Sequence, residues 1–216
     1  MQSRHSVFIL GFILFLIYWQ WFLPGPKVAN DLPFVSSSAL KSSLNFPQAW
    51  SEYGAEGLGE YSVFTLWSWP TAFLSGLLAN LGLSFPLIER FLIMIPFFIL
   101  GILGMWKLGE DLKLPTPAKF IAGMFYLTNT YILLVLDGGQ LTIGLAYAFF
   151  PLSFLAVKRS IDGKIKDRIL AGLSIWIIGF LDIRFVYILV LLCFLHFVYG
   201  LLIERKKLKE WVLKWF

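Results

Sequence analysis

Six long apolar runs constrain the fold of this chain more than any other sequence feature. An α-helix needs about 20 apolar residues to cross the roughly 30 Å of bilayer hydrocarbon, and most of the runs approach that length. Each run is expected to be helical, because lipid offers no hydrogen-bond partner to an unpaired backbone group. The sequence therefore predicts an all-α, polytopic transmembrane helical bundle with about six spans. The runs cover residues 7–23, 87–108, 120–136, 141–157, 169–181 and 185–203.

The composition also indicates a membrane environment. Hydrophobic residues form 58% of the 216 and charged residues only 14%, whereas about a quarter of the residues in soluble domains are charged. The mean hydropathy is +0.77. The net charge of +5 does not indicate nucleic-acid binding. The basic residues form short clusters between the apolar runs, as they do in the cytoplasmic loops of membrane proteins.

A seventh apolar segment, at residues 63–85, decides the predicted topology. If it spans the membrane, the two termini face opposite sides and the basic loop 158–168 lies outside. If it lies in the interface or re-enters, both termini are cytoplasmic, and 14 of the 18 Lys and Arg residues lie inside. The positive-inside rule favours the second arrangement. Trp67, Trp69 and the helix-breaking Pro70 also suit an interfacial helix.

We therefore expect a single transmembrane domain over residues 1–216, in the plasma membrane, with both termini cytoplasmic. After the first span, residues 24–86 form an extracytoplasmic loop with juxtamembrane helices. Residues 87–203 then form five further spans, and residues 204–216 form a basic cytoplasmic tail. The run at 169–181 is short, and it spans only if the charges that follow it lie at or near the interface.

Asp31 is the candidate catalytic residue of this topology. It follows the first span by about eight residues, within the only long polar stretch of the chain, residues 24–62. A carboxylate at this place can act as a general base if an acceptor hydroxyl lies within hydrogen-bond reach. The alternative is a solvated turn aspartate, because Asn30-Asp31 before Leu32-Pro33 is favourable turn chemistry.

Charges at the span ends are the candidates for substrate binding, since a charge within a membrane is costly unless it is paired or hydrated. Arginine suits a phosphate-bearing ligand because its planar fork binds oxygens in pairs. The alternatives are structural: each acid pairs with the arginine beside it, Gly138-Gly139 forms a tight turn, and Asp137 caps the next helix. The predicted substrate-binding residues are Glu89, Arg90, Asp137, Gln140, Asp182 and Arg184.

The sequence excludes several other kinds of site. Two histidines and a single cysteine exclude a His-rich metal site and a Ser-His-Asp triad. No Gly-rich phosphate loop, zinc-ligand spacing or nucleophile elbow occurs. An enzyme with this sequence therefore depends on carboxylates and arginines. Its cofactor stays unassigned, with a divalent cation as one option.

Short motifs along most of the chain carry a family resemblance. They resemble the N-terminal region of GT-C membrane glycosyltransferases, above all the alpha-(1→3)-arabinofuranosyltransferase type and its archaeal and bacterial relatives. In that fold, the first span precedes a long extracytoplasmic loop with juxtamembrane helices and a catalytic aspartate near its beginning. The motifs are Asn30-Asp31-Leu32-Pro33, Trp50, Gly57-Leu58-Gly59-Glu60-Tyr61, Trp69-Pro70, Leu81-Gly82-Leu83, Glu89-Arg90 and Ala122-Gly123-Met124-Phe125-Tyr126.

The resemblance implies that Asp31 deprotonates a sugar acceptor and that the donor is a polyprenyl-phosphate-linked sugar arriving from the membrane lipid. Arg90 or Arg184 would neutralise the phosphate. Family members have more spans and usually a large outer domain, so the chain is expected to be the N-terminal part of a larger protein, or one half of a split protein with a second polypeptide. The alternative functions are a transporter or flippase subunit and a non-catalytic membrane scaffold.

Overall fold

The computed structural model describes residues 2–27, 36–46, 50–51, 60–61 and 63–203. Within these ranges the chain is helical apart from one short antiparallel pairing, Trp50 with Tyr61 and Ser51 with Glu60. The elements are α1 (Gln2–Ile17), η1 (Trp19–Phe22), α2 (Ser37–Ser42), β1 (Trp50–Ser51), β2 (Glu60–Tyr61), α3 (Val63–Asn80), α4 (Phe85–Glu89), η3 (Arg90–Met94), α5 (Ile95–Asp111), α6 (Thr116–Thr128), α7 (Thr130–Asp137), α8 (Leu141–Asp162), α9 (Ile165–Leu181) and α10 (Ile183–Ile203).

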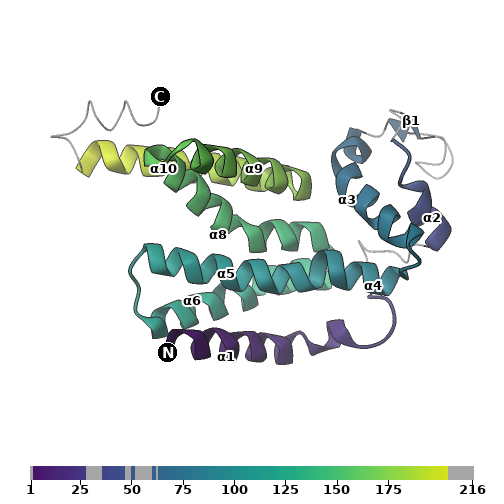
Figure 1. The fold of residues 1–216 in the computed structure, drawn as a ribbon, viewed down its shortest axis with the longest axis horizontal. Helices are drawn as coiled ribbons and strands as arrows, with labels where there is room; N and C mark the ends of the chain where they lie inside the picture. Colours follow the sequence, from purple (N-terminus) through teal and green to yellow (C-terminus); the bar gives the residue numbers. More distant parts are fainter. Residues whose placement is uncertain (1, 28–35, 47–49, 52–59, 62, 204–216) are drawn as a thin grey trace.

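The long helical segments run back and forth between two ends of the molecule (Figure 1). The segments α1, α4–α5, α6–α7, α8, α9 and α10 alternate in direction along the chain. The basic end holds the start of α1 and the turns at residues 112–115 and 163–164. The linker end holds the chain that leaves η1 at residues 23–27, the turn at residues 138–140, and Asp182. These two names are used below.

Four helical segments of the described chain are long and apolar enough to cross a bilayer: Phe85–Asp111, Thr116–Asp137, Leu141–Ile161 and Ile183–Leu202. They confirm the predicted all-α class and support a membrane protein. The predicted spans at 7–23 and 169–181 correspond to shorter helices. The apolar part of α1 covers His5–Ile17, and α9 has 17 residues. The count of six spans stays a prediction.

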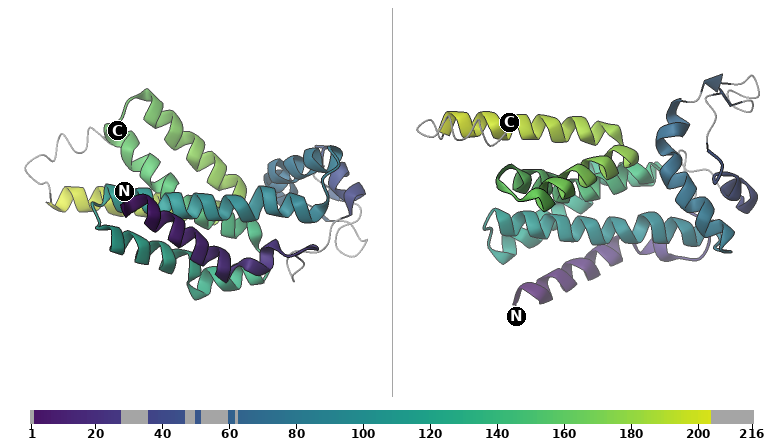
Figure 2. Two further views of the ribbon diagram at one scale, coloured as in Figure 1. Left: turned by 60° about the horizontal axis from the view of Figure 1, so that its bottom comes forward. Right: turned by 45° about the horizontal axis from the view of Figure 1, so that its top comes forward.

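The helix α3 lies across the direction of the long helices at the linker end (Figure 2). It contains Pro70, it is not among the four long apolar segments, and it packs against α2, α4 and α9. It ends at Asn80, and Gly82 then adopts a positive φ of 91° before α4 begins. This direction is the one expected of a helix lying along a membrane surface.

The predicted span at residues 120–136 is broken into two helices at Asn129. Asn129 is extended, with φ −69° and ψ 159°, and its Oδ1 accepts a hydrogen bond from the Ile132 amide at 3.1 Å. Its Nδ2 donates to the Tyr126 carbonyl at 2.8 Å and to the Tyr147 hydroxyl at 2.9 Å. An asparagine that caps a new helix in this way satisfies the polar groups exposed by the break. We missed this cap in the apolar run.

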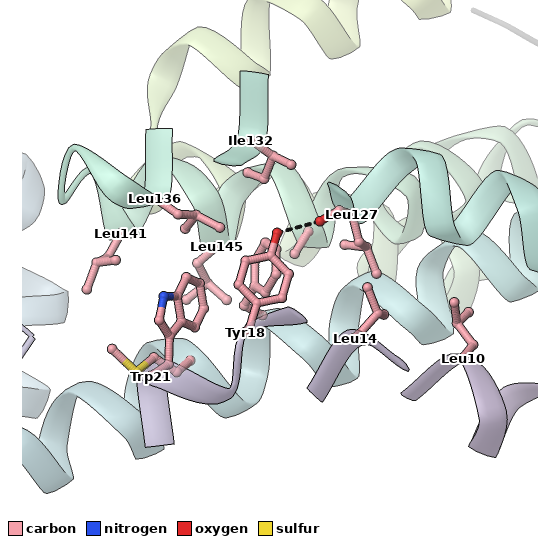
Figure 3. Packing of buried hydrophobic residues seen from close by; sticks show 12 residues of the cluster. Leu10, Leu14, Tyr18, Trp21, Leu127, Ile132, Leu136, Leu141 and Leu145 are labelled. Atoms are coloured by element: carbon pink, nitrogen blue, oxygen red, sulfur yellow. Dashed lines mark hydrogen bonds between the residues drawn. The ribbon is translucent and has the colours of Figure 1, made fainter. Parts of the chain in front are cut away.

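The main core fastens the end of α1 to the middle of the bundle (Figure 3). Leu10 and Leu14 project from α1 toward Leu127 of α6. The hydroxyl of Tyr18, which is 4% exposed, donates to the Leu127 carbonyl at 2.5 Å. Trp21 lies beside Tyr18, with 4.7 Å between the ring centroids. The chain that follows η1 therefore starts from a fixed position at the linker end.

Substitutions of glycine can test the close packing of α5 against α6 in this core. A Cβ atom at Gly101 would lie 2.5 Å from Cδ2 of the fully buried Leu127, whereas a Cβ atom at Gly172 meets nothing within 4 Å. We predict that Gly101→Ala lowers the free energy of unfolding by about 1–3 kcal/mol through overpacking. Gly172→Ala should leave it unchanged or raise it by up to about 1 kcal/mol, since alanine favours a helix.

Thermal unfolding in detergent measures both variants against the unsubstituted chain. A Gly101→Ala midpoint equal to that of Gly172→Ala would contradict the α5–α6 packing described here.

Candidate functional site

Arg90 and Glu89 hold the linker that leaves the first helical segment. The Arg90 guanidinium donates through Nη2 to the carbonyls of Leu23 and Gly25, the latter at 2.9 Å. One residue earlier, Oε2 of Glu89 accepts a hydrogen bond from the Lys27 amide at 3.2 Å. The two neighbouring side chains thus bind both kinds of backbone group on one short stretch of chain. They clamp residues 23–27 against the start of α4–α5.

Arg90 begins a π-helical turn, whose bond runs from the Ile95 amide to the Arg90 carbonyl. The turn η3 precedes Pro96, which lacks an amide hydrogen and crowds the helical turn before it. The Arg90 amide bonds to the Leu87 carbonyl, three residues back, and the Arg90 Nη1 donates to the Pro86 carbonyl at 2.5 Å. The side chain thereby bonds a carbonyl of its own helix as well as the linker.

One carboxylate oxygen of Glu89, Oε1, takes no part in the clamp. Its side chain is only 2% exposed, and no described residue forms a hydrogen bond with Oε1. Buried carboxylate oxygens in proteins nearly always have a hydrogen-bond partner. Among the described residues, Oε1 is therefore a buried polar atom whose partner is not seen.

A cavity of about 270 Å³ opens beside the linker, between the end of α1 and α7. We call it the linker cavity. Lys27, Asp137 and Gln20 contribute its polar groups, and Leu133 and Leu134 belong to its apolar wall. An ammonium group, a carboxylate and an amide above an apolar wall can bind an amphiphile whose polar head carries both a phosphate and hydroxyl groups. The full lining is Ile17, Tyr18, Gln20, Trp21, Lys27, Leu133, Leu134, Leu136 and Asp137.

Asp182 and Arg184 pair with each other, as the structural alternative predicts. The Arg184 Nε lies 2.9 and 3.0 Å from the two carboxylate oxygens of Asp182. Asp182 Oδ1 also accepts the Arg184 amide at 2.8 Å, at the start of α10. The Asp182 side chain is 9% exposed and that of Arg184 is 65% exposed. The pair therefore neutralises a buried carboxylate and leaves one face of the guanidinium exposed.

The turn between α7 and α8 separates Asp137 from Gln140. Gly139 has a φ of 88°, which favours glycine, and the Gln140 amide bonds to the Val135 carbonyl at 3.0 Å. Gln140 occupies the N-cap position of α8, so the alternative that Asp137 caps the next helix is wrong. Asp137 instead ends α7 with its side chain exposed, at the linker cavity.

The structure brings some of the predicted site residues together and separates others. Glu89 and Arg90 meet at the linker, and Asp137 lines the cavity beside it. Asp182 and Arg184 lie at the same end as a separate pair. Asp31 lies outside the described residues. We missed Lys27, although it was visible as the first cation after the first apolar run.

Among the described residues, no three His, Cys, Asp or Glu side chains gather where they could hold a metal ion. No family model, no curated protein and no solved structure matches the chain. The carboxylates and basic groups at the linker end are therefore the basis for the function proposed below.

The clamp predicts a change in hydrogen exchange at the linker. Pro24 and Pro26 have no amide hydrogen, so the Lys27 amide is a direct reporter of the bond to Glu89. We predict that Glu89→Ala speeds its exchange about fivefold, because a hydrogen bond of this kind contributes about 1 kcal/mol. Arg90→Met should also speed exchange in the peptide covering residues 23–27, since it frees the linker carbonyls.

Glu89→Gln and Arg184→Met are the matched controls, measured by mass spectrometry on the same peptide. Glutamine keeps an acceptor for the Lys27 amide, and Arg184 binds Asp182 rather than the linker. Equal exchange in Glu89→Ala and in the controls would show that the clamp does not hold the linker in solution.

Proposed function

We propose that the chain is a GT-C-type membrane glycosyltransferase, or the N-terminal module of one, with its site at the linker end. It transfers a sugar from a polyprenyl-phosphate-linked donor to an acceptor on the extracytoplasmic face. The observation that carries the proposal is the Glu89–Arg90 clamp, which anchors the polar stretch containing Asp31 beside the linker cavity.

Covalent geometry keeps Asp31 close to this anchor. Asp31 is four positions after Lys27, and four residues extend over at most about 14 Å. Lys27 itself lines the linker cavity together with Asp137. Asp31 therefore lies no more than about 14 Å from Lys27, as the proposal requires of a base that serves an acceptor at the cavity.

In the proposed reaction, the Asp31 carboxylate takes the proton of an acceptor hydroxyl. The hydroxyl oxygen then attacks the anomeric carbon of the donor sugar. The bond between that carbon and the phosphate oxygen breaks, and polyprenyl phosphate leaves with the electron pair. The Lys27 ammonium belongs to the lining of the linker cavity, and in this proposal it stabilises the charge that develops on the leaving phosphate.

The arginines take a different part in this proposal from the one that the resemblance implies. Arg90 already donates to the carbonyls of Leu23, Gly25 and Pro86, so it positions the linker rather than binding phosphate directly. Arg184 uses one edge of its guanidinium on Asp182. Its exposed edge remains a candidate phosphate ligand, although Arg184 does not line the linker cavity.

A second cavity suits the lipid part of the donor. It has a volume of about 540 Å³ and lies between α3 and α9 at the linker end. Its lining includes Trp69, Phe73, Leu74, Trp176 and Phe180, which offer apolar and aromatic surface. A groove of this kind, between a helix lying across the bundle and a lengthwise helix, can hold an isoprenoid chain at membrane depth.

The proposal predicts that Asp31→Asn abolishes sugar transfer while membrane insertion is kept. Loss of a general base costs about 10²- to 10⁴-fold in rate. Transfer from a panel of polyprenyl-phosphate sugars is measured on membranes containing the chain, with Glu110→Gln, an exposed carboxylate at the basic end, as the control. Full activity of Asp31→Asn would overturn the assignment, and so would the absence of transfer by the unsubstituted chain in its complete assembly.

The proposed topology has its own test. In a Cys193→Ala background, Asn80→Cys should react with an impermeant thiol reagent from outside, and Leu112→Cys only after the membrane is opened. Asn80 ends α3 and Leu112 follows α5, so the α4–α5 segment lies between the two positions and puts them on opposite sides. Asn80 is expected outside because α3 lies in the interface in the six-span arrangement. Labelling of position 112 from outside would contradict both that arrangement and the placement of the linker end.

A further inference from the structure

A third cavity lies at the basic end, far along the bundle from the linker cavity. It has a volume of about 320 Å³ and is enclosed by α5, α8 and α9. Lys107 from α5 and Arg159 from α8 contribute two cationic side chains, and Asp167 from α9 contributes one carboxylate. Phe149, Leu152 and Leu170 belong to its apolar wall. The glycosyltransferase proposal does not use this cavity.

The charge at this cavity is available to a ligand. Asp167 is held at the start of α9, where its Oδ2 accepts the Lys164 amide at 2.9 Å, and two cations against its one carboxylate leave the cavity with a net positive charge. Lys158, the residue before Arg159, pairs with Asp111, and Lys119 lies over the Trp106 ring at 4.9 Å. In the part of the chain that the structure describes, no acid forms an ion pair with Lys107 or Arg159. Both of these side chains are exposed.

The depth of the cationic groups matches the interfacial region of a membrane. Lys107 lies four residues before the end of α5, and Arg159 lies three residues before the end of α8. Each is therefore about one helical turn inside the end of a long helix. Phe149 lies ten residues before Arg159 on the same helix, or about 15 Å deeper. Cations above an apolar wall of this length fit a phosphate group above an acyl chain.

We propose that the basic-end cavity binds an anionic phospholipid. Its phosphate lies between Lys107 and Arg159, and one acyl chain lies along Phe149, Leu152 and Leu170. A free phosphate would contact the two cations but not the apolar wall. A zwitterionic lipid would place its own positive charge near the two cations of the cavity, which would repel it. Because the lipid touches α5, α8 and α9, its binding also holds these three helices together.

The test uses the purified full chain in a mild detergent, titrated with phosphatidylglycerol or phosphatidylcholine. Bound lipid is counted by native mass spectrometry, and the thermal midpoint is followed in parallel. We expect phosphatidylglycerol to bind and to raise the midpoint more than phosphatidylcholine does. The double variant Lys107→Gln/Arg159→Gln should bind phosphatidylglycerol about 25-fold more weakly, since each basic group near a lipid phosphate contributes about fivefold in affinity.

The matched control is Lys113→Gln/Lys166→Gln, which removes two basic residues from the same end but outside the cavity lining. It should keep the affinity of the unsubstituted chain. An equal loss in the control would mean that the lipid is attracted by the basic end in general, and the proposed site would be wrong. Lys107→Arg, which keeps the charge, should also bind normally.

Two further arms need no variant, and so they decide the proposal even if the double variant fails to fold. Inorganic phosphate should not raise the midpoint, and dihexanoyl phosphatidylglycerol should bind far more weakly than the long-chain lipid. Equal protection by inorganic phosphate would identify a simple anion site and overturn the lipid assignment. Equal binding of the two phosphatidylglycerols would show that the apolar wall takes no part.

Discussion

The hydrogen bonds from Arg90 to the carbonyls of Leu23 and Gly25 connect the end of the first helical segment to the start of α4–α5. Glu89 completes the connection through the Lys27 amide. The position of the linker, the shape of the cavity beside it and the place where the polar stretch begins all depend on this clamp. Tyr18 stabilises the same region, because its buried hydroxyl donates to the Leu127 carbonyl and so joins the end of α1 to α6.

The two ends of the bundle differ in chemistry. At the linker end, Arg90 binds the linker backbone and Asp182 binds Arg184, while the linker cavity has one charge of each sign, Lys27 and Asp137. At the basic end, Lys158 and Lys119 tie helices together, while Lys107 and Arg159 face a cavity. The proposed sugar transfer and the proposed lipid site therefore use different ends, and each can fail without the other.

Much of the helical architecture was predictable because a helix in lipid must satisfy its backbone within its own segment. The predicted spans at 141–157 and 185–203 correspond to α8 and α10, whose observed bounds differ at one end each. The helix break at Asn129 was not predicted, because a single polar residue in an apolar run gives no local signal of a break. Asn129 ends one helix and caps the next through the Ile132 amide, and its bond to the Tyr147 hydroxyl depends on α8.

The sequence by itself determined the helical class, the apolar character of the long segments and the segregation of basic residues, because these follow from local patterns. It also identified Glu89, Arg90, Asp182 and Arg184 as charges that need partners. Only the tertiary structure decided which partners they take. Arg90 binds carbonyls 65 and 67 residues away, whereas Arg184 binds an acid two residues away. Both sets of bonds satisfy the same requirement, that a charge at a helix end be compensated. Only the packing of α1 against α5 and α6 brings the linker within reach of Arg90.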